Sequence, residues 1–154
     1  MRVLALDLGK RRVGLAISDA SGVLARPLDV IDASGPAQLL RVTEAIRRIS
    51  AEDDGLAVVV VGYPTRLDGT PNEQTAGVTA FVDELRDRIQ QPIVLQDERL
   101  SSVEAESRLA LNDRDWRSRK KKLDAAAAAV ILQDYLDTVG RETESRIQKP
   151  ESRR

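Results

Sequence analysis

Carboxylates are the side chains of this sequence best suited to chemistry. Asp7 ends an apolar run, Asp97 and Glu98 follow another, and Asp124 stands just before a run of alanines. The chain has no histidine and no cysteine, which excludes thiolate and imidazole metal sites, cysteine nucleophiles and histidine acid–base catalysis. Such carboxylates suit Mg²⁺ or Mn²⁺, which prefer oxygen ligands and can promote attack on a phosphodiester. A structural site for a hard ion is the alternative, and it leaves the neighbouring basic residues unexplained.

The first of these acids stands at the end of a strand that we expect to be central. Residues 3–6 and Leu8 are apolar with little alternation, which is typical of a strand buried on both faces. Gly9 allows a tight turn, after which a second apolar run returns beside the first. A carboxylate is costly to bury unless it is hydrogen-bonded, paired or bound to a metal, so Asp7 indicates a site. The alternative is a turn aspartate that binds its own backbone.

A second pair of acids is predicted to reach the same edge of the sheet. Residues 93–96 form an expected strand that runs directly into Asp97 and Glu98. In open α/β sheets, sites form at the carboxyl ends of strands near a switch in strand order, and the first, fourth and fifth strands should end together. The alternative is that Asp97 or Ser101 caps the next helix, and Ser101 with Glu104 matches a capping box.

The third acid is predicted to lie at the start of the last helix, on the face that packs against the sheet. Asp124 shares one stripe with Ala128, Ile131 and Tyr135. The alanines 125–129 would let this helix approach the sheet closely and carry Asp124 toward the other acids. Alternatively, Asp124 only interacts favourably with the helix dipole.

The elements that must position these acids follow an α/β order. Beyond the hairpin, residues 23–31 predict a third strand, and Pro27 within it favours the edge of the sheet. The pattern then predicts a helix opened by 34–36, a strand 56–61, a helix 73–89, the strand 93–96, and helices 102–111 and 123–136. Residues 62–69 are expected to form a loop that admits a phosphate or serves as a plain connection. The expected fold is βββαβαβαα, a five-stranded mixed sheet flanked by helices, with right-handed crossovers.

Length and composition suit one domain without a membrane span. The 154 residues are 42% hydrophobic and 32% charged, which is typical of one globular core. We assign residues 1–138 to this domain and expect 139–154, which are polar and aperiodic, to form a disordered tail. The opening apolar run is too short for a signal peptide, and no stretch approaches the roughly twenty residues of a membrane span, so we expect a cytoplasmic protein.

Basic residues gather near the acids although the net charge is only −1. This net charge argues against coating nucleic acid through bulk positive charge, so binding would need a local patch that neutralises phosphates and stacks a base. The candidate nucleic-acid-binding residues are Lys10, Arg11 and Arg12 on the hairpin, and Arg99, Arg114, Trp116, Arg117, Arg119, Lys120, Lys121 and Lys122 before the last helix. The alternatives are a solvated linker whose Trp116 packs on the last helix, and a structural Arg12 that pairs with an acid near the hairpin.

Four segments together resemble one known family. Residues 7–19 match the pattern D-x-G-x-x-R-x-G-x-A-x-S-D throughout. The others are Val61-Gly62-Tyr63-Pro64 with Gly69, then Asp97-Glu98-Arg99-Leu100-Ser101-Ser102, then Lys122 and Asp124 followed by Ala126, Ala127, Ile131, Leu132 and Tyr135. In this order they resemble the YqgF/RuvX family of RNase H-like proteins, described as Holliday junction resolvases and as pre-16S rRNA nucleases. The resemblance spans residues 1 to about 137.

The resemblance implies an RNase H-like fold and a divalent-metal nuclease that acts on structured nucleic acid. It implies that Asp7, Glu98 and Asp124 are the catalytic, metal-binding acids, with Mg²⁺ or Mn²⁺ as cofactor, and only the resemblance ranks Glu98 above Asp97. It favours 5′-end processing of pre-16S rRNA, with Holliday junction resolution as the alternative. A junction resolvase is expected to act as a symmetric homodimer, so that two sites meet two strands, although no sequence feature fixes a dimer surface.

Two other classes of function stay open at this stage. A non-catalytic nucleic-acid-binding factor would use the same surface without cutting. A relative of ATPases and sugar kinases would share an Asp-x-Gly turn on a first hairpin, but those proteins enclose the nucleotide between two such domains, and this chain has length for one. The nuclease therefore leads.

Overall fold

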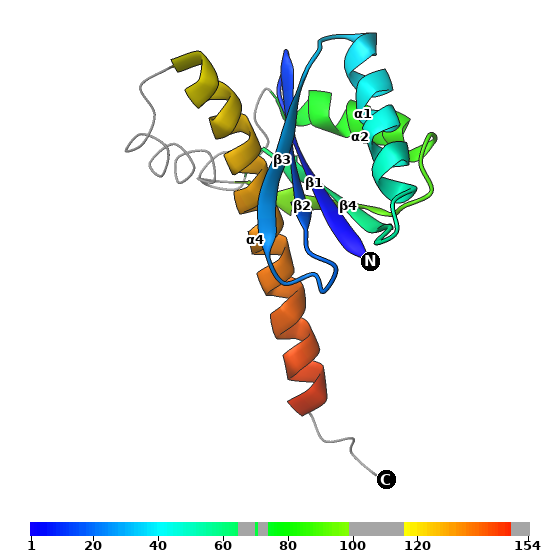
Figure 1. Ribbon diagram of the computed structural model, residues 1–154, viewed down its shortest axis with the longest axis vertical. Helices are drawn as coiled ribbons and strands as arrows, with labels where there is room; N and C mark the ends of the chain where they lie inside the picture. Colours follow the sequence, from blue (N-terminus) through cyan, green and yellow to red (C-terminus); the bar gives the residue numbers. More distant parts are fainter. Residues whose placement is uncertain (65–69, 71–73, 99–115, 149–154) are drawn as a thin grey trace.

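A computed structural model describes residues 1–64, 70, 74–98 and 116–148, and of 116–121 and 144–148 it describes the backbone alone. Figure 1 shows the elements: β1 Arg2–Leu8, β2 Arg12–Ser18, β3 Ala25–Asp32, α1 Pro36–Ser50, β4 Leu56–Tyr63, α2 Thr75–Arg86, β5 Ile93–Asp97 and α4 Trp116–Gln148. The predicted helix 102–111 and the capping box that begins at Ser101 lie outside the described residues.

The strands form one mixed sheet in the order β3-β2-β1-β4-β5. β1, β2 and β3 pair antiparallel, whereas β4 and β5 extend the sheet from β1 in parallel. β1 is therefore central, and the carboxyl ends of β1, β4 and β5 meet at one edge. This confirms the sheet that the sequence predicts.

The third strand lies at the edge, where Pro27 is tolerated, but it begins later than the sequence predicts. The backbone N–H groups of Val23 and Leu24 donate to the carboxylate of Asp19 at 2.9 and 3.1 Å. These residues consequently belong to the loop, and β3 begins at Ala25.

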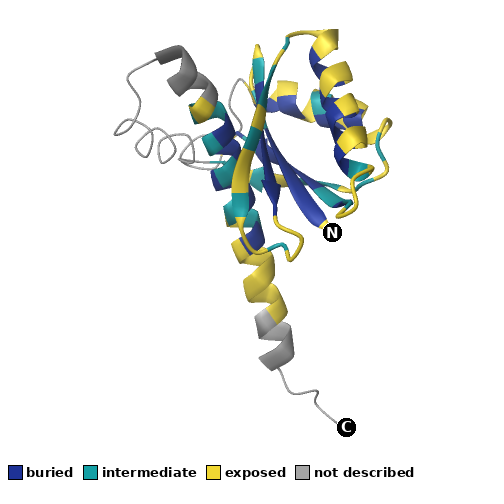
Figure 2. Cartoon of the chain, viewed as in Figure 1, coloured by how far each residue is buried: buried dark blue, intermediate teal, exposed yellow. Residues whose placement is uncertain are grey.

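Helices cover both faces of the sheet and bury β1 between two cores. On one face, Leu4 and Leu6 pack into the core beneath α1 and α2; on the other, Val3 and Ala5 pack with residues of α4. Figure 2 shows the inner strands buried and the outer sides of the helices exposed. Alternation along β1 therefore decides which layer each side chain meets.

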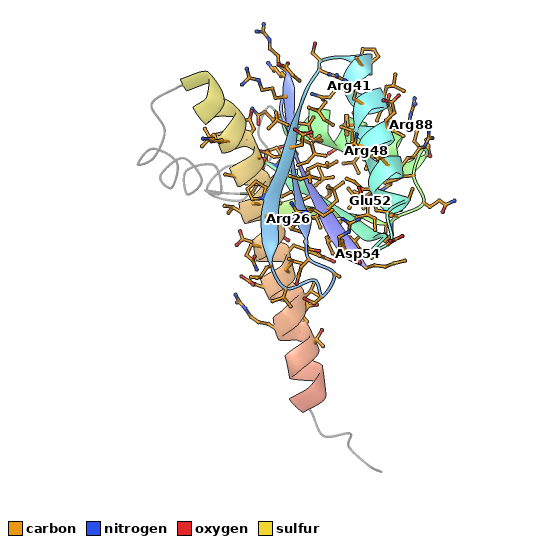
Figure 3. All side chains as sticks on the ribbon, in the orientation of Figure 1. Arg26, Arg41, Arg48, Glu52, Asp54 and Arg88 are labelled. Atoms are coloured by element: carbon orange, nitrogen blue, oxygen red, sulfur yellow. The ribbon has the colours of Figure 1, made fainter. Side chains whose placement is uncertain are left out.

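The buried Arg2 lies at the end of the sheet opposite to the carboxyl ends of β1, β4 and β5, where its charge is paired and hydrogen-bonded. Arg2 Nη2 donates to Glu52 Oε2 at 2.9 Å, and the guanidinium also donates to the carbonyl oxygens of Ile49 and Gly55 (Glu52 is labelled in Figure 3). These contacts tie the start of β1 to the end of α1. The positive charge of Arg2 therefore has a structural role.

The last helix is much longer than the predicted 123–136. Residues 116–122, expected to precede the last helix, belong to it, and residues 139–148, expected as a disordered tail, are helical as well. Their lysines, arginines and glutamates are strong helix formers, and no proline interrupts them, so the helix continues past its contacts with the sheet. Residues 137–143 of this helix are exposed. Among the helices that the structure describes, none has a stretch long and apolar enough to cross a membrane. The division at residue 138 stays a prediction.

Candidate active site

The carboxylate of Asp7 lies on the α4 face of the sheet, between two glycines. Val3 and Ala5 point to this face, so alternation points Asp7 there as well. On the neighbouring strand β2, Asp7 pairs with Gly14. On the other side Leu6 pairs with Val61, which brings Gly62 of β4 next to Asp7. Because neither neighbour has a side chain, other groups can approach the Asp7 carboxylate from both sides.

Gly14 lets α4 touch the backbone of β2. A Cβ atom at this position would lie 2.1 Å from the backbone oxygen of Asp124. A glycine inside a strand marks such a close approach. Because the helix can come this near, Asp124 is held over the same face of the sheet as Asp7.

Gly62 makes room for Glu98 in the same way. A Cβ atom there would lie 2.6 Å from Glu98 Oε2 and 2.7 Å from the Cδ1 atom of Ile131. The Glu98 N–H donates to the Tyr63 carbonyl oxygen at 3.3 Å, which places the residue directly beyond the end of β5. From this position the Glu98 side chain lies across Gly62 toward Asp7. Gly62 and Tyr63 therefore belong to β4 and not to the predicted loop 62–69, whose residues 65–69 lie outside the described chain.

The register of β5 separates the two adjacent acids Asp97 and Glu98. Asp97 pairs with Tyr63, which packs against the core beneath α1 and α2. Glu98 instead crosses Gly62 on the α4 face. The sequence alone could not distinguish these neighbours, whereas the fold directs only Glu98 toward Asp7.

Asp7 and Glu98 are joined by a hydrogen bond, and the pKa values of both carboxyl groups are raised. Burial raises the pKa of Asp7 to about 6, against the effect of its hydrogen bond with Glu98, and the charge of Asp124 raises it further. Burial, followed by the charge of Asp7 and the same hydrogen bond, raises the pKa of Glu98 to about 8. At neutral pH Glu98 therefore keeps its proton and donates it to the Asp7 carboxylate. Strongly perturbed carboxylates of this kind are a mark of functional sites.

Arg12 lies beside the third acid. Its Nη1 atom is 3.9 Å from Asp124 Oδ2, which is too long for a hydrogen bond, and both side chains are about one-quarter exposed, at 26% and 28%. Nη1 is buried and makes no hydrogen bond within the described residues. This contact agrees with the structural alternative for Arg12, an ion pair with an acid near the hairpin.

Gly9, Ser18 and Asp19 of the segment 7–19 have structural roles at the two ends of β2. A Cβ atom at Gly9 would lie 2.8 Å from the carbonyl oxygen of Arg12, so the turn needs a glycine. At the far end of β2, the buried Ser18 Oγ accepts the Val3 N–H at 2.8 Å. Hydrogen bonds from the Ser21 hydroxyl and the N–H groups of Leu24 and Val23 lower the pKa of Asp19 to about 2. Asp19 consequently orders the next loop.

The predicted basic residues are placed only in part. Lys10 and Arg11 are exposed at the tip of the hairpin that begins after Asp7, and Lys122 is exposed two residues before Asp124. Arg99 and Arg114 lie outside the described residues. The backbone of α4 contains Trp116, Arg117, Arg119, Lys120 and Lys121.

The donor set fits a hard cation, although the described residues contain no group of three acids arranged to hold one ion. Two carboxylates, Asp7 and Glu98, are in contact, and Asp124 is close enough for its charge to act on Asp7. Mg²⁺ commonly binds through one or two carboxylates and completes its shell with water and substrate phosphates. The roles of Gly14 and Gly62 were missed from the sequence, and the available signal was a glycine within an apolar strand.

Comparison with known proteins identifies the family. The profile "RuvX: Holliday junction resolvase" matches residues 1–138. The chain belongs to the RuvX family. A relative from Desulforudis audaxviator, named "Putative pre-16S rRNA nuclease", is 40% identical over 139 residues, which cover 90% of this chain and 95% of the relative. A relative of the same name from Geobacillus kaustophilus is 38% identical over 140 residues, which cover 90% and 99%.

Solved structures share the fold of this RuvX-family chain. RuvC of T. thermophilus in complex with Holliday junction substrate matches with a TM-score of 0.52 and 17% identity, covering 91% of this chain and 96% of that one. Fowlpox virus resolvase with Holliday junction DNA matches with a TM-score of 0.55 and 11% identity, covering 90% and 99%. The RNase H-like fold is confirmed.

Proposed function

We propose that this protein is a divalent-metal-dependent nuclease that hydrolyses phosphodiester bonds in structured nucleic acid, in the 5′-end processing of pre-16S rRNA. The observation that carries the proposal is the meeting of Asp7 and Glu98, which are hydrogen-bonded to each other across Gly62 beside Asp124, at the carboxyl ends of the strands. Carboxylates held this close tend to exchange their proton for a cation. The names of the relatives support the substrate, and rRNA processing implies that the protein works in the cytoplasm.

Asp7, Glu98 and Asp124 would hold Mg²⁺ or Mn²⁺. When bound, such an ion stabilises charge on the phosphate oxygens and lowers the pKa of a water molecule for hydrolysis. Asp7 contributes a buried carboxylate from the rigid central strand. Glu98 would bind such a cation as a carboxylate, and Arg12 would orient Asp124 through their ion pair.

The basic residues would bind the substrate backbone. Lys10 and Arg11 are exposed on the hairpin that begins after Asp7, where they can neutralise phosphates of a bound strand. Lys122 is exposed on α4, two residues before Asp124. The remaining basic residues and Trp116 stay a prediction for the same role.

Holliday junction resolution is the second candidate, favoured by the description of the family whose profile matches. It requires a symmetric homodimer, so that two sites cut two strands. A binding factor without catalysis is the remaining alternative. The three functions differ in substrate and in cleavage, so one experiment separates them.

The test is cleavage of a structured pre-16S rRNA fragment and a four-way DNA junction, each with Mg²⁺, Mn²⁺ or chelator. We expect metal-dependent cutting of the RNA, reduced more than about a hundredfold by Asp7→Asn and Glu98→Gln, since losing even the partners of metal ligands costs 10- to 100-fold. Asp97→Asn is the matched control, because this acid neighbours Glu98 but does not reach Asp7. Preferential cutting of the junction would establish resolution instead. Binding without cutting, unchanged by Asp7→Asn, would overturn the nuclease.

A further inference from the structure

A pocket of about 310 Å³ opens on the face of the sheet opposite to the acids. It lies between the tip of the β1–β2 hairpin, the first turn of α1 and the first half of α2. Its walls include the apolar side chains of Leu8, Val78 and Phe81, and its polar groups include Lys10 and Gln38. The active-site acids do not line it.

The pocket and the acids lie on the two sides of one strand end. Asp7 and Leu8 are consecutive, so their Cα atoms are about 3.8 Å apart, yet their side chains point to opposite faces. Leu8 packs against the core beneath α1 and α2. A single polynucleotide strand that crosses this edge can therefore reach the acids with a phosphate and the pocket with a neighbouring base.

Gln38 gives the pocket a hydrogen-bond acceptor. Its side chain is buried, with 9% exposed, and Nε2 donates to the carbonyl oxygens of Gly9 at 2.8 Å and Ala33 at 3.0 Å. These two acceptors fix the orientation of the amide and use both of its N–H groups. Oε1 accepts no hydrogen bond from the described residues, so it is available to a donor in the pocket.

This combination of walls and polar groups suits a nucleobase. Phe81, Leu8 and Val78 offer apolar contact to the faces of a planar ring. The Gln38 acceptor suits an N–H on the edge of a base, and the exposed Lys10 suits the attached phosphate. A simple anion would not need the apolar walls, and an aliphatic chain would not need the acceptor or the cation.

We propose that this pocket, here called the base pocket, takes an unpaired nucleobase of the substrate, next to the phosphodiester held at the acids. The proposal rests on the proposed function and adds a requirement to the substrate. Because a base must leave its stack to enter, a fully paired duplex is cut more slowly than a strand with an unpaired nucleotide beside the cleaved bond.

Two helical glycines provide a matched pair of variants. A Cβ atom at Gly77, which lines the base pocket from α2, would meet nothing within 4 Å, and the same holds for Gly140 on the exposed part of α4. Leucine is a better helix former than glycine, so neither substitution opposes its helix. Gly77→Leu fills the base pocket, whereas Gly140→Leu makes the same chemical change elsewhere.

The chain contains a single phenylalanine, which makes the base pocket directly observable. We would incorporate 4-fluorophenylalanine into the full chain and titrate adenosine and cytidine 5′-monophosphates, with ribose 5-phosphate as the probe that lacks a base. We expect a saturable ¹⁹F shift with a nucleotide and none with ribose 5-phosphate. Gly77→Leu should weaken binding about fivefold or more, as expected for the loss of one stacked base, and Gly140→Leu should not. Equal shifts with ribose 5-phosphate, or unchanged binding in Gly77→Leu, would overturn the base pocket.

Cleavage then separates this proposal from the proposed function. A series of substrates carries one abasic nucleotide at each position around the cut, and we expect cleavage to fall about fivefold or more at one of them. Gly77→Leu should be insensitive to that abasic position. A nucleotide-induced ¹⁹F shift without any cleavage would reject the nuclease and keep the base pocket. Normal cleavage by Gly77→Leu at every substrate would reject the base pocket and keep the nuclease.

Discussion

The backbone oxygen of Asp124 occupies the space in which any side chain at position 14 would lie, with 2.1 Å left to a Cβ atom of Gly14. This contact joins the helix that bears the third acid to the hairpin that bears the first. Neither backbone can yield without moving its whole element. The position of Asp124 over the sheet therefore requires that residue 14 have no side chain.

Gly14→Ala should accordingly damage both the fold and the site. We expect the free energy of unfolding to fall by about 1–3 kcal/mol, as is typical when a packed contact is overfilled, and cleavage to be lost because α4 moves away. Gly77→Ala is the control for stability, since its Cβ meets open space and a helical alanine gains roughly 1 kcal/mol over glycine. Denaturant unfolding measures both variants. A Gly14→Ala protein as stable and active as the wild type would contradict the contact.

Gly62→Ala should separate activity from stability. Its Cβ would meet the ends of two side chains, Glu98 Oε2 at 2.6 Å and Ile131 Cδ1 at 2.7 Å, both of which can move. We expect cleavage to fall at least tenfold because Glu98 is displaced, with a smaller loss of stability than in Gly14→Ala. Cleavage assays and denaturant unfolding of Gly62→Ala and Gly14→Ala test this prediction, and a larger loss of stability in Gly62→Ala than in Gly14→Ala would contradict it.

The metal-free protein should become less stable as the pH rises. The pKa of Asp7 is raised from 3.8 to about 6, and that of Glu98 from 4.5 to about 8. At a pH between the lower and the higher value of each group, the folded state therefore binds more protons than the unfolded state. Their contribution to stability is complete below about pH 4 and is lost as the pH passes through 6 and then 8. Thermal unfolding in chelator measures the slope.

Two comparisons support this interpretation of the pH dependence. Glu98→Gln should flatten the slope, because glutamine donates to Asp7 at every pH. Added Mg²⁺ should restore stability at pH 8, since a cation replaces the Glu98 proton. A slope that is unchanged in Glu98→Gln would assign the pH dependence to other groups.

Asp19 should act in the opposite direction and away from catalysis. Its pKa is lowered to about 2 by hydrogen bonds from Ser21, Leu24 and Val23, so its contribution to stability is present above pH 4 and is lost as the pH falls through 2. We expect Asp19→Asn to lower the melting temperature at pH 7, with a difference that narrows toward pH 2 and with cleavage retained. Asp53→Asn, an exposed acid without a hydrogen bond to the described residues, is the control. An unchanged melting temperature in Asp19→Asn would show that the loop does not depend on this carboxylate.

Local pattern was enough to predict the sheet and the family. The unbroken apolar runs of β1 and β4 could only be buried strands, and Pro27 had to lie at an edge because it cannot donate to a neighbour. Helix ends were harder to predict. α4 continues to Gln148 because exposed lysine, arginine and glutamate residues suit a solvated helix as well as a tail, and hydrophobic periodicity does not distinguish the two.

The sequence by itself determined which carboxylates this protein offers and that the ends of three strands would gather them. Only the tertiary structure decided which of them meet. The register of β5 against β4 turned Glu98, and not Asp97, toward Asp7, and contact across Gly14 brought Asp124 over them. The base pocket likewise joins Leu8, Gln38 and Phe81, which no local pattern connects. Patterns along the chain report burial and secondary structure, whereas contacts between distant side chains depend on register and on the closeness of backbones.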